Sequence, residues 1–127
     1  MLKRELGFGS GYLIEIGDYS GIGINAHIPN NTIIGDYVMM GPNCYIVDAN
    51  HSFDDLSKPM MFQGRNEIKQ TIIGNDVWIG RDVLMMPGRT ISDGSIIAGG
   101  CVLTKDFPEY SVVGGNPSKL IKSRKNG

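Results

Sequence analysis

The chain has 127 residues, of which 41% are hydrophobic and 20% are charged, so we expect one globular domain spanning residues 1–127. Its 12 basic and 13 acidic residues give a formal net charge of −1, which argues against nucleic acid or an anionic membrane surface as the main partner. No apolar run approaches the roughly 20 residues that span a bilayer, and the first residues lack a signal-peptide core, so the sequence predicts a cytoplasmic protein.

A six-residue period of aliphatic side chains begins in the N-terminal part of the chain. Within each period a glycine commonly follows the aliphatic residue, as Gly23 follows Ile22, and a compact residue such as Ala26 stands four positions after it. Neither the 3.6-residue period of an α-helix nor a heptad fits this spacing, so the pattern predicts short strands joined by turns. The aliphatic positions of this first series are Ile16, Ile22, Ile28, Ile34, Met40 and Ile46.

Each six-residue unit is expected to form one strand and one turn, with the aliphatic side chain pointing inward. One unit buries little surface, whereas three units complete a triangular coil of about 18 residues that stacks on the next coil. Stacking places each inward residue over its counterpart at the spacing of hydrogen-bonded strands, about 4.7 to 4.9 Å. The sequence therefore predicts an all-β fold, a parallel β-helix with roughly four regular coils.

A segment at about residues 48–70 interrupts the period. It contains Pro59, two adjacent acidic residues and the motif Asn50-His51-Ser52, and it shows no six-residue repeat. A long segment without regular structure inside a compact domain is usually either functional or disordered. We therefore predict a protruding loop here, with His51 near its start.

The period resumes in a new register after this segment, at Ile73, Ile79, Met85, Ile91, Ile97 and Leu103. Cys44 and Cys101 fall in the compact inward slot of their repeats, which predicts core packing rather than a disulfide or a nucleophile. His27 occupies the last slot of its repeat, where side chains face outward, and is expected to be an ordinary surface residue. Arg89 stands where a compact residue is expected.

The second series and its continuation, IGNDVWIGRDVLMMPGRTISDGSIIAGGCVLTKDFPEYSVVGGNPSKLI, resemble the hexapeptide-repeat acyltransferases, which include sugar, maltose and xenobiotic O-acetyltransferases. The resemblance covers about residues 14–122. It implies a single-stranded left-handed parallel β-helix with one protruding loop and a short C-terminal tail. It also implies acetyl-CoA as co-substrate, no metal, and a homotrimer with its active sites between subunits.

The resemblance assigns residues to the two halves of the reaction. His51 matches the general base, which accepts the proton of the acceptor while the acceptor attacks the thioester. Its other ring nitrogen must then donate to a backbone carbonyl or to a carboxylate such as Asp48. Small residues would let the pantetheine arm approach the backbone, and lysines would meet the nucleotide phosphates. The matching donor-binding positions are Trp78, Gly80, Ala98, Gly99, Thr104, Lys105, Asn116, Pro117, Lys119 and Lys122.

The acceptor is less closely specified by the sequence. Polar residues of the loop offer hydrogen bonds suited to a polyol, which favours O-acetylation of a carbohydrate. These residues are Asp54, Asp55, Gln63, Arg65 and Asn66. Amino-sugar N-acetylation and serine acetylation stay open, as does a structural trimeric β-helix without activity. A zinc carbonic anhydrase needs three histidine ligands, and the chain has 2 histidines.

Overall fold

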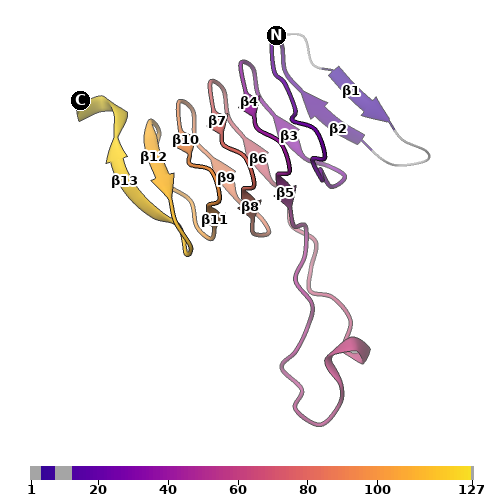
Figure 1. Cartoon of the computed structure of the whole chain (residues 1–127). Coiled ribbons are helices and arrows are strands. Elements are labelled where there is room, and N and C mark those ends of the chain that lie inside the picture. Colours follow the sequence, from indigo (N-terminus) through magenta and orange to yellow (C-terminus); the bar gives the residue numbers. More distant parts are fainter. Residues whose placement is uncertain (1–3, 8–12, 127) are drawn as a thin grey trace.

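The computed structural model describes residues 4–7 and 13–126, which form a stack of short strands and turns with one long loop projecting from its side (Figure 1). The strands are β1 (Arg4–Gly7), β2 (Leu13–Ile16), β3 (Ile33–Ile34), β4 (Met39–Met40), β5 (Tyr45–Ile46), β6 (Ile72–Ile73), β7 (Trp78–Ile79), β8 (Leu84–Met85), β9 (Thr90–Ile91), β10 (Ile96–Ile97), β11 (Val102–Leu103), β12 (Ser111–Gly114) and β13 (Lys119–Ser123). The described helices are the 3₁₀ turns η1 (Met60–Phe62) and η2 (Arg124–Asn126), and none is long and apolar enough to cross a membrane.

The strands form three sheets, which we call A, B and C. Sheet A has the order β1-β2-β3-β6-β9, sheet B the order β13-β12-β10-β7-β4, and sheet C the order β11-β8-β5. From β3 to β11, consecutive strands enter sheets A, B and C in turn, and neighbours within each sheet are parallel. Each circuit is therefore one coil, and the parallel stacking that the sequence predicts is confirmed.

The core lies inside the coils. Every aliphatic position of the two predicted series is buried except Ile22, which is partly buried and packs against the others. In the strands from β3 to β11, the second residue is buried and the first faces outward, because successive side chains of a strand point to opposite faces. Full burial of one such aliphatic side chain contributes about 1.5 to 3 kcal/mol, so the stacked interior is the main source of stability.

The corners between sheets explain the repeated glycines. The left-handed residue of a corner is usually not the glycine after the strand but the residue two positions later, such as Tyr37 (φ 59°) or Asp82 (φ 57°). The glycine is needed instead because neighbouring coils approach closely. A Cβ atom on Gly80 would lie 2.5 Å from the backbone nitrogen of Gly99 in the next coil. The sequence pattern thus marks the corners, although close approach rather than turn conformation selects the glycine.

Two antiparallel pairs, which the six-residue period does not predict, lie at the ends of the stack. Strand β1 pairs with β2 at the N-terminal end, and β13 pairs with β12 at the C-terminal end. Phe107 forms a parallel bridge with Ile91 and packs partly buried against the core. Antiparallel additions of this kind cover sheet edges that would otherwise present unpaired backbone groups.

Candidate functional site

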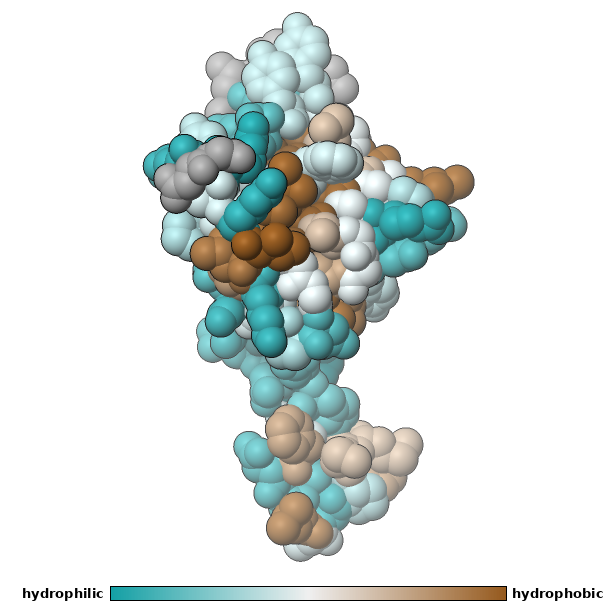
Figure 2. Space-filling view, turned by 60° about the vertical axis from the view of Figure 1, so that its left-hand side comes forward, coloured by the Kyte–Doolittle hydropathy of each residue, from teal (hydrophilic) through white to brown (hydrophobic). Residues whose placement is uncertain are grey.

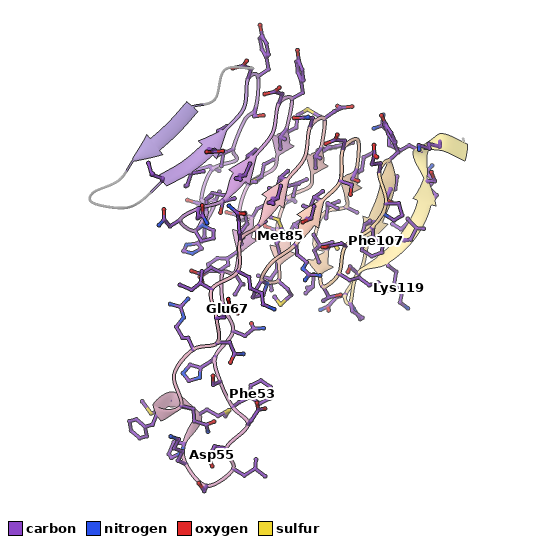
Figure 3. All side chains as sticks on the ribbon, turned by 180° about the vertical axis from the view of Figure 1, so that it is seen from behind. Phe53, Asp55, Glu67, Met85, Phe107 and Lys119 are labelled. Atoms are coloured by element: carbon purple, nitrogen blue, oxygen red, sulfur yellow. The ribbon has the colours of Figure 1, made fainter. Side chains whose placement is uncertain are left out.

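The base of the projecting loop is a two-stranded ribbon. The loop leaves the coils after β5 and returns before β6, and its arms pair through an antiparallel bridge between His51 and Arg65. Three backbone hydrogen bonds extend this pairing: Lys69 to Asp48 (2.9 Å), Asn66 to Asn50 (2.8 Å) and Ser52 to Gly64 (2.8 Å). Figure 3 shows Glu67 near the coils and Phe53 and Asp55 in the distal part of the loop. The ribbon therefore fixes the backbone of His51 close to the coil stack.

The imidazole of His51 is held by the chain next to it. Its Nδ1 atom lies 2.8 Å from the carbonyl oxygen of Ser52. Because a carbonyl only accepts, Nδ1 is the nitrogen that carries the proton in the neutral imidazole, and the lone pair of that tautomer is on Nε2. Of the two orienting partners that the sequence allows, the backbone carbonyl is the one found. Asp48 instead accepts a 2.7 Å hydrogen bond from the guanidinium of Arg65.

His51 lines an open pocket of about 480 Å³ between the outer face of sheet C and the loop ribbon. The pocket is lined by His27, Tyr45, Ile46, Val47, Asp48, Ala49, His51 and Arg65. The rings of His27 and Tyr45 stack, with centroids 4.1 Å apart and planes 10° apart. His27 is exposed as predicted, yet it shares the pocket with His51, which the sequence reasoning missed. The signal for it was the 18-residue spacing of His27 and Tyr45, one coil apart in the same slot.

The ion pair between Asp48 and Arg65 is the charged part of this pocket, with 31% and 57% of the two side chains exposed. Most other polar residues proposed for a polyol are engaged within the loop. Gln63 bonds to both backbone groups of Asp55, and hydrogen bonds from Ser57 hold the pKa of the exposed Asp55 carboxyl below its usual range. Asn66 accepts a hydrogen bond from Ser52. Of the five loop residues considered, Arg65 alone lines the described pocket.

Apart from Trp78, the predicted donor-binding residues fall into three places. Gly80, Ala98 and Gly99 lie at the corners between sheets B and C, where Gly80 and Gly99 face each other across adjacent coils. Thr104 and Lys105 follow β11 at the opposite edge of sheet C. The remaining residues, Asn116, Pro117, Lys119 and Lys122, belong to the β12–β13 hairpin, with a cis peptide bond between the first two.

The hairpin is tied to the edge of sheet C. The backbone nitrogen of Thr104 donates to the hydroxyl of Ser118 (2.9 Å), and the two hydroxyls lie 3.0 Å apart. The ammonium of Lys105 lies 5.6 Å from the centroid of the Phe107 ring. These contacts bring Lys105 and the exposed Lys119 to the C-terminal end of the stack, where Figure 3 shows Lys119.

Trp78 lies on a different face of the chain from His51. It projects from β7 on the outer side of sheet B, with 52% of its surface exposed, beside Met39 with 60% exposed. Figure 2 shows hydrophobic surface gathered on the coil stack and, separately, on the projecting loop. The structure thus brings His51 together with sheet C residues, and within one chain it does not bring His51 to Trp78.

The two thiols belong to the core, as predicted. Cys44 and Cys101 are buried and free, and burial raises the pKa of both. The thiol of Cys44 is 3.2 Å from the carbonyl oxygen of Gly80. Within the described residues, no cluster of three or more His, Cys, Asp or Glu side chains is arranged to hold a metal ion.

Comparison with known proteins agrees with the coil arrangement. A family model described as bacterial transferase hexapeptide, with six repeats, matches residues 14–48 and 70–105, and its gap coincides with the loop. A chloramphenicol acetyltransferase of Klebsiella aerogenes is 52% identical over 107 residues, covering 72% of this chain and 51% of that protein. A probable acetyltransferase of Mycobacterium tuberculosis is 40% identical over 92 residues, covering 72% of this chain and 30% of that protein.

Solved structures share the same architecture. A hexapeptide-repeat acetyltransferase of Vibrio cholerae in complex with acetyl coenzyme A superimposes with a TM-score of 0.79 at 33% identity, covering 91% of this chain and 62% of that one. A galactoside acetyltransferase in complex with coenzyme A gives a TM-score of 0.67 at 31% identity, covering 82% and 55%. The chain spans only 26%, 30% and 44% of the length of three curated relatives.

Proposed function

The chain belongs to the bacterial transferase hexapeptide family, and from that premise we propose that it transfers an acetyl group from acetyl-CoA to a hydroxyl of a sugar or related small polar acceptor. The observation that carries the proposal is His51, held at Nδ1 by the Ser52 carbonyl and lining a pocket between the loop and sheet C. Relatives named as acetyltransferases, and similar structures that contain acetyl-CoA or coenzyme A, support the same reaction.

His51 acts as general base in this proposal. Its Nε2 atom accepts the hydroxyl proton while the acceptor oxygen attacks the thioester carbonyl, and the imidazolium then returns the proton to the sulfur as the C–S bond breaks. The Ser52 carbonyl stabilises the positive ring through the hydrogen bond at Nδ1. A backbone carbonyl suits this role, because it fixes the tautomer without itself taking up the proton.

We propose further that three chains assemble and that the coils wind left-handed, as the resemblance implies. Trp78 and His51 lie on different faces of one chain, so a site that contains both requires His51 of one chain beside Trp78 of a neighbour. The exposed apolar side chains of Met39 and Trp78 supply a surface that association would bury. Residues 1–127 then form a single acyltransferase domain with the loop at about residues 48–70 as its excursion.

In this proposal the donor lies in a groove between neighbouring chains. Because Gly80, Ala98 and Gly99 have no side chain or only a methyl group, the pantetheine amides can approach the backbone at the corners between sheets B and C. Trp78 offers an apolar wall, and Thr104, Asn116 and Pro117 shape the end of the groove. Lys105, Lys119 and Lys122 lie at the C-terminal end, where mobile ammonium groups suit the nucleotide phosphates.

Thiol release from acetyl-CoA tests the proposal, with sugars, amino sugars, serine and chloramphenicol as acceptors. We expect acceptor-dependent release with a sugar, and a fall in kcat of about 10² to 10⁴ for His51→Ala. Lys58→Ala, an exposed loop substitution, should leave the rate unchanged. Calorimetry should find the same coenzyme A affinity for His51→Ala as for the wild type.

Other results would point to other functions. If only serine or an amino sugar is acetylated, that compound becomes the proposed acceptor in place of a sugar hydroxyl, and His51 is still the proposed base. If His51→Ala turns over as fast as the wild type, His51 is not the general base. Absence of both turnover and coenzyme A binding would leave a structural β-helix, because the fold alone does not establish a reaction.

A further inference from the structure

The carbonyl that orients His51 belongs to Ser52, and the rest of Ser52 is tied to the returning arm of the loop. Its backbone nitrogen donates to the carbonyl oxygen of Gly64 at 2.8 Å, and its hydroxyl donates to the side-chain oxygen of Asn66 at 2.7 Å. Asn66 is fixed in turn, because its backbone nitrogen donates to the carbonyl oxygen of Asn50 at 2.8 Å. Ser52 is therefore held through both its main chain and its side chain.

The hydroxyl bond lies where the two arms of the ribbon stop pairing. Beyond Ser52, the next hydrogen bond between the arms within the described residues joins the backbone nitrogen of Asp55 to the side chain of Gln63 (3.1 Å). The peptide unit that carries the Ser52 carbonyl thus follows the last backbone pair of the ribbon. Paired backbone at such an end opens more readily than backbone inside it. The bond from Ser52 to Asn66 restricts this opening beside the imidazole ring of His51.

The two side chains of this bond lie outside the pocket. Neither Ser52 nor Asn66 is among the residues that line the described pocket, whereas His51 is. The sequence placed Asn66 with the polar residues suited to an acceptor, but its side-chain oxygen receives the Ser52 hydroxyl instead. An effect of either side chain on the reaction would therefore pass through the His51 ring and not through contact with the acceptor.

We propose that Asn66 and the hydroxyl of Ser52 are positioning residues for His51: their hydrogen bond fixes the Ser52 carbonyl, which keeps the proton of the neutral imidazole on Nδ1 and aligns Nε2 with the acceptor. The inference rests on the proposed role of His51 as general base. A base accepts a proton efficiently only when its lone pair is aligned with the attacking group, so support of the ring contributes to kcat. Without that support the tautomer protonated at Nε2 becomes populated, and it has no lone pair at that nitrogen.

Steady-state kinetics test this role with an acceptor that the enzyme acetylates. Ser52→Ala and Asn66→Ala should each lower kcat about three- to tenfold, the range expected for one lost hydrogen bond, and leave KM for the acceptor and for acetyl-CoA within about twofold of the wild type. The double variant should lose no more than either single variant, because both remove the same bond. Ser52→Thr keeps the hydroxyl and Asn66→Asp keeps the acceptor oxygen, so both should recover kcat.

Ser57→Ala is the matched control for Ser52→Ala. The Ser57 hydroxyl donates to a carboxylate oxygen of Asp55 at 2.6 Å in the distal part of the same loop, so the variant also removes one exposed hydrogen bond but leaves the ribbon intact. Its kcat should stay that of the wild type. An equal fall of kcat in Ser57→Ala would attribute the effect to the loop as a whole and overturn the positioning role.

Two further kinetic results would also overturn the inference. A higher KM for the acceptor with unchanged kcat in Asn66→Ala would show that Asn66 contacts the acceptor directly. Additive losses in the double variant would show that Ser52 and Asn66 act separately.

Nitrogen-15 NMR of the histidine rings separates this inference from the proposed function, because it needs no substrate. In alkaline buffer, where imidazole is neutral, His51 of the wild type should carry its proton on Nδ1, and Asn66→Ala should show a mixture of the two tautomers. The chain has 2 histidines, and His27 should be unchanged as the internal reference. The same His51 tautomer in the wild type and in both alanine variants would overturn the inference and leave the proposed reaction intact. The expected tautomer change in a chain that transfers no acetyl group would support the hydrogen-bond tie and refute the reaction.

Discussion

Adjacent residues of one strand in this chain have opposite environments. In β6, Ile73 is 1% exposed inside the coils and Ile72 is 37% exposed on the outer face of sheet A. Ile73 pairs with Ile34 in the coil before it and with Ile91 in the coil after it. The same side chain therefore has a different energetic role according to whether it falls on the inward or the outward position of the period.

This contrast makes a prediction for two neighbouring substitutions. Ile73→Ala should lower the free energy of unfolding by about 2 to 5 kcal/mol, because it removes buried methyl groups and leaves a cavity between coils. Ile72→Ala should change it by about 0.5 kcal/mol, as is usual at the surface. Urea unfolding followed by circular dichroism would measure both. Equal losses from the two variants would contradict the inward and outward assignment.

Arg89 shows how one slot tolerates an unexpected residue. It occupies the compact corner position, yet its guanidinium turns to the edge of the coils and donates to the carbonyl oxygens of Thr104 (3.0 Å) and Pro87 (3.3 Å). It also lies 3.5 Å from a carboxylate oxygen of Asp106. The corner therefore accepts a long side chain because the two terminal guanidinium nitrogens find partners outside the apolar interior, although Nε is buried without a hydrogen-bond partner among the described residues.

At the corner between sheets A and B, side chains from successive coils form a ladder of hydrogen bonds. Asp36 accepts from the backbone nitrogen of Asp18 (2.8 Å), Asn75 from that of Asp36 (2.8 Å), and Asp93 from that of Asn75 (2.7 Å). Each side chain thus satisfies a backbone donor in the preceding coil. Asp and Asn are suited to this position because their short side chains readily form hydrogen bonds with nearby backbone groups.

The ladder predicts that the side-chain oxygen of Asp93 stabilises the fold as a hydrogen-bond acceptor and that its negative charge does not contribute. Asp93→Ala should lower the free energy of unfolding by about 1 kcal/mol, because the backbone nitrogen of Asn75 loses its partner. Asp93→Asn retains an acceptor and should be close to the wild type. Thermal unfolding of the two variants side by side would measure this. A loss in Asp93→Asn as large as that in Asp93→Ala would show that charge, not the hydrogen bond, stabilises the corner.

At the scale of the whole molecule, the outer face of sheet B leads to a prediction about assembly. The proposed trimer should have three times the 13.8 kDa mass of the chain in light scattering. Met39→Asp should shift the mass toward the monomer, because a charge would be placed on an apolar surface that association buries.

Leu13→Asp is the control for this change. Leu13 is 51% exposed on sheet A, outside the proposed groove, so the mass should stay that of the wild type. A monomer in the wild type, or an unchanged mass in Met39→Asp, would contradict the proposed interface. A monomeric wild type would also require His51 and Trp78 to act in separate sites.

The six-residue period was sufficient to predict which residues face inward, where the corners fall and that the coils stack in parallel. It also placed the loop at about residues 48–70, where the family model has its gap. These features follow from sequence because each unit repeats the same local choice, and each inward residue stacks on its counterpart one coil away. The same logic would have paired His27 with Tyr45, had the outward slots been compared as the inward ones were.

The features that lie outside the six-residue repeat were determined only by the tertiary structure. The arms of the loop pair through bonds such as Ser52 to Gly64, and this pairing sets Arg65 against Asp48 rather than Asp48 against His51. The antiparallel strands β1 and β13 likewise depend on chain reversals at the ends. Such contacts join segments whose side chains carry no common pattern. Their geometry follows from which backbone groups remain to be satisfied once the coils have formed.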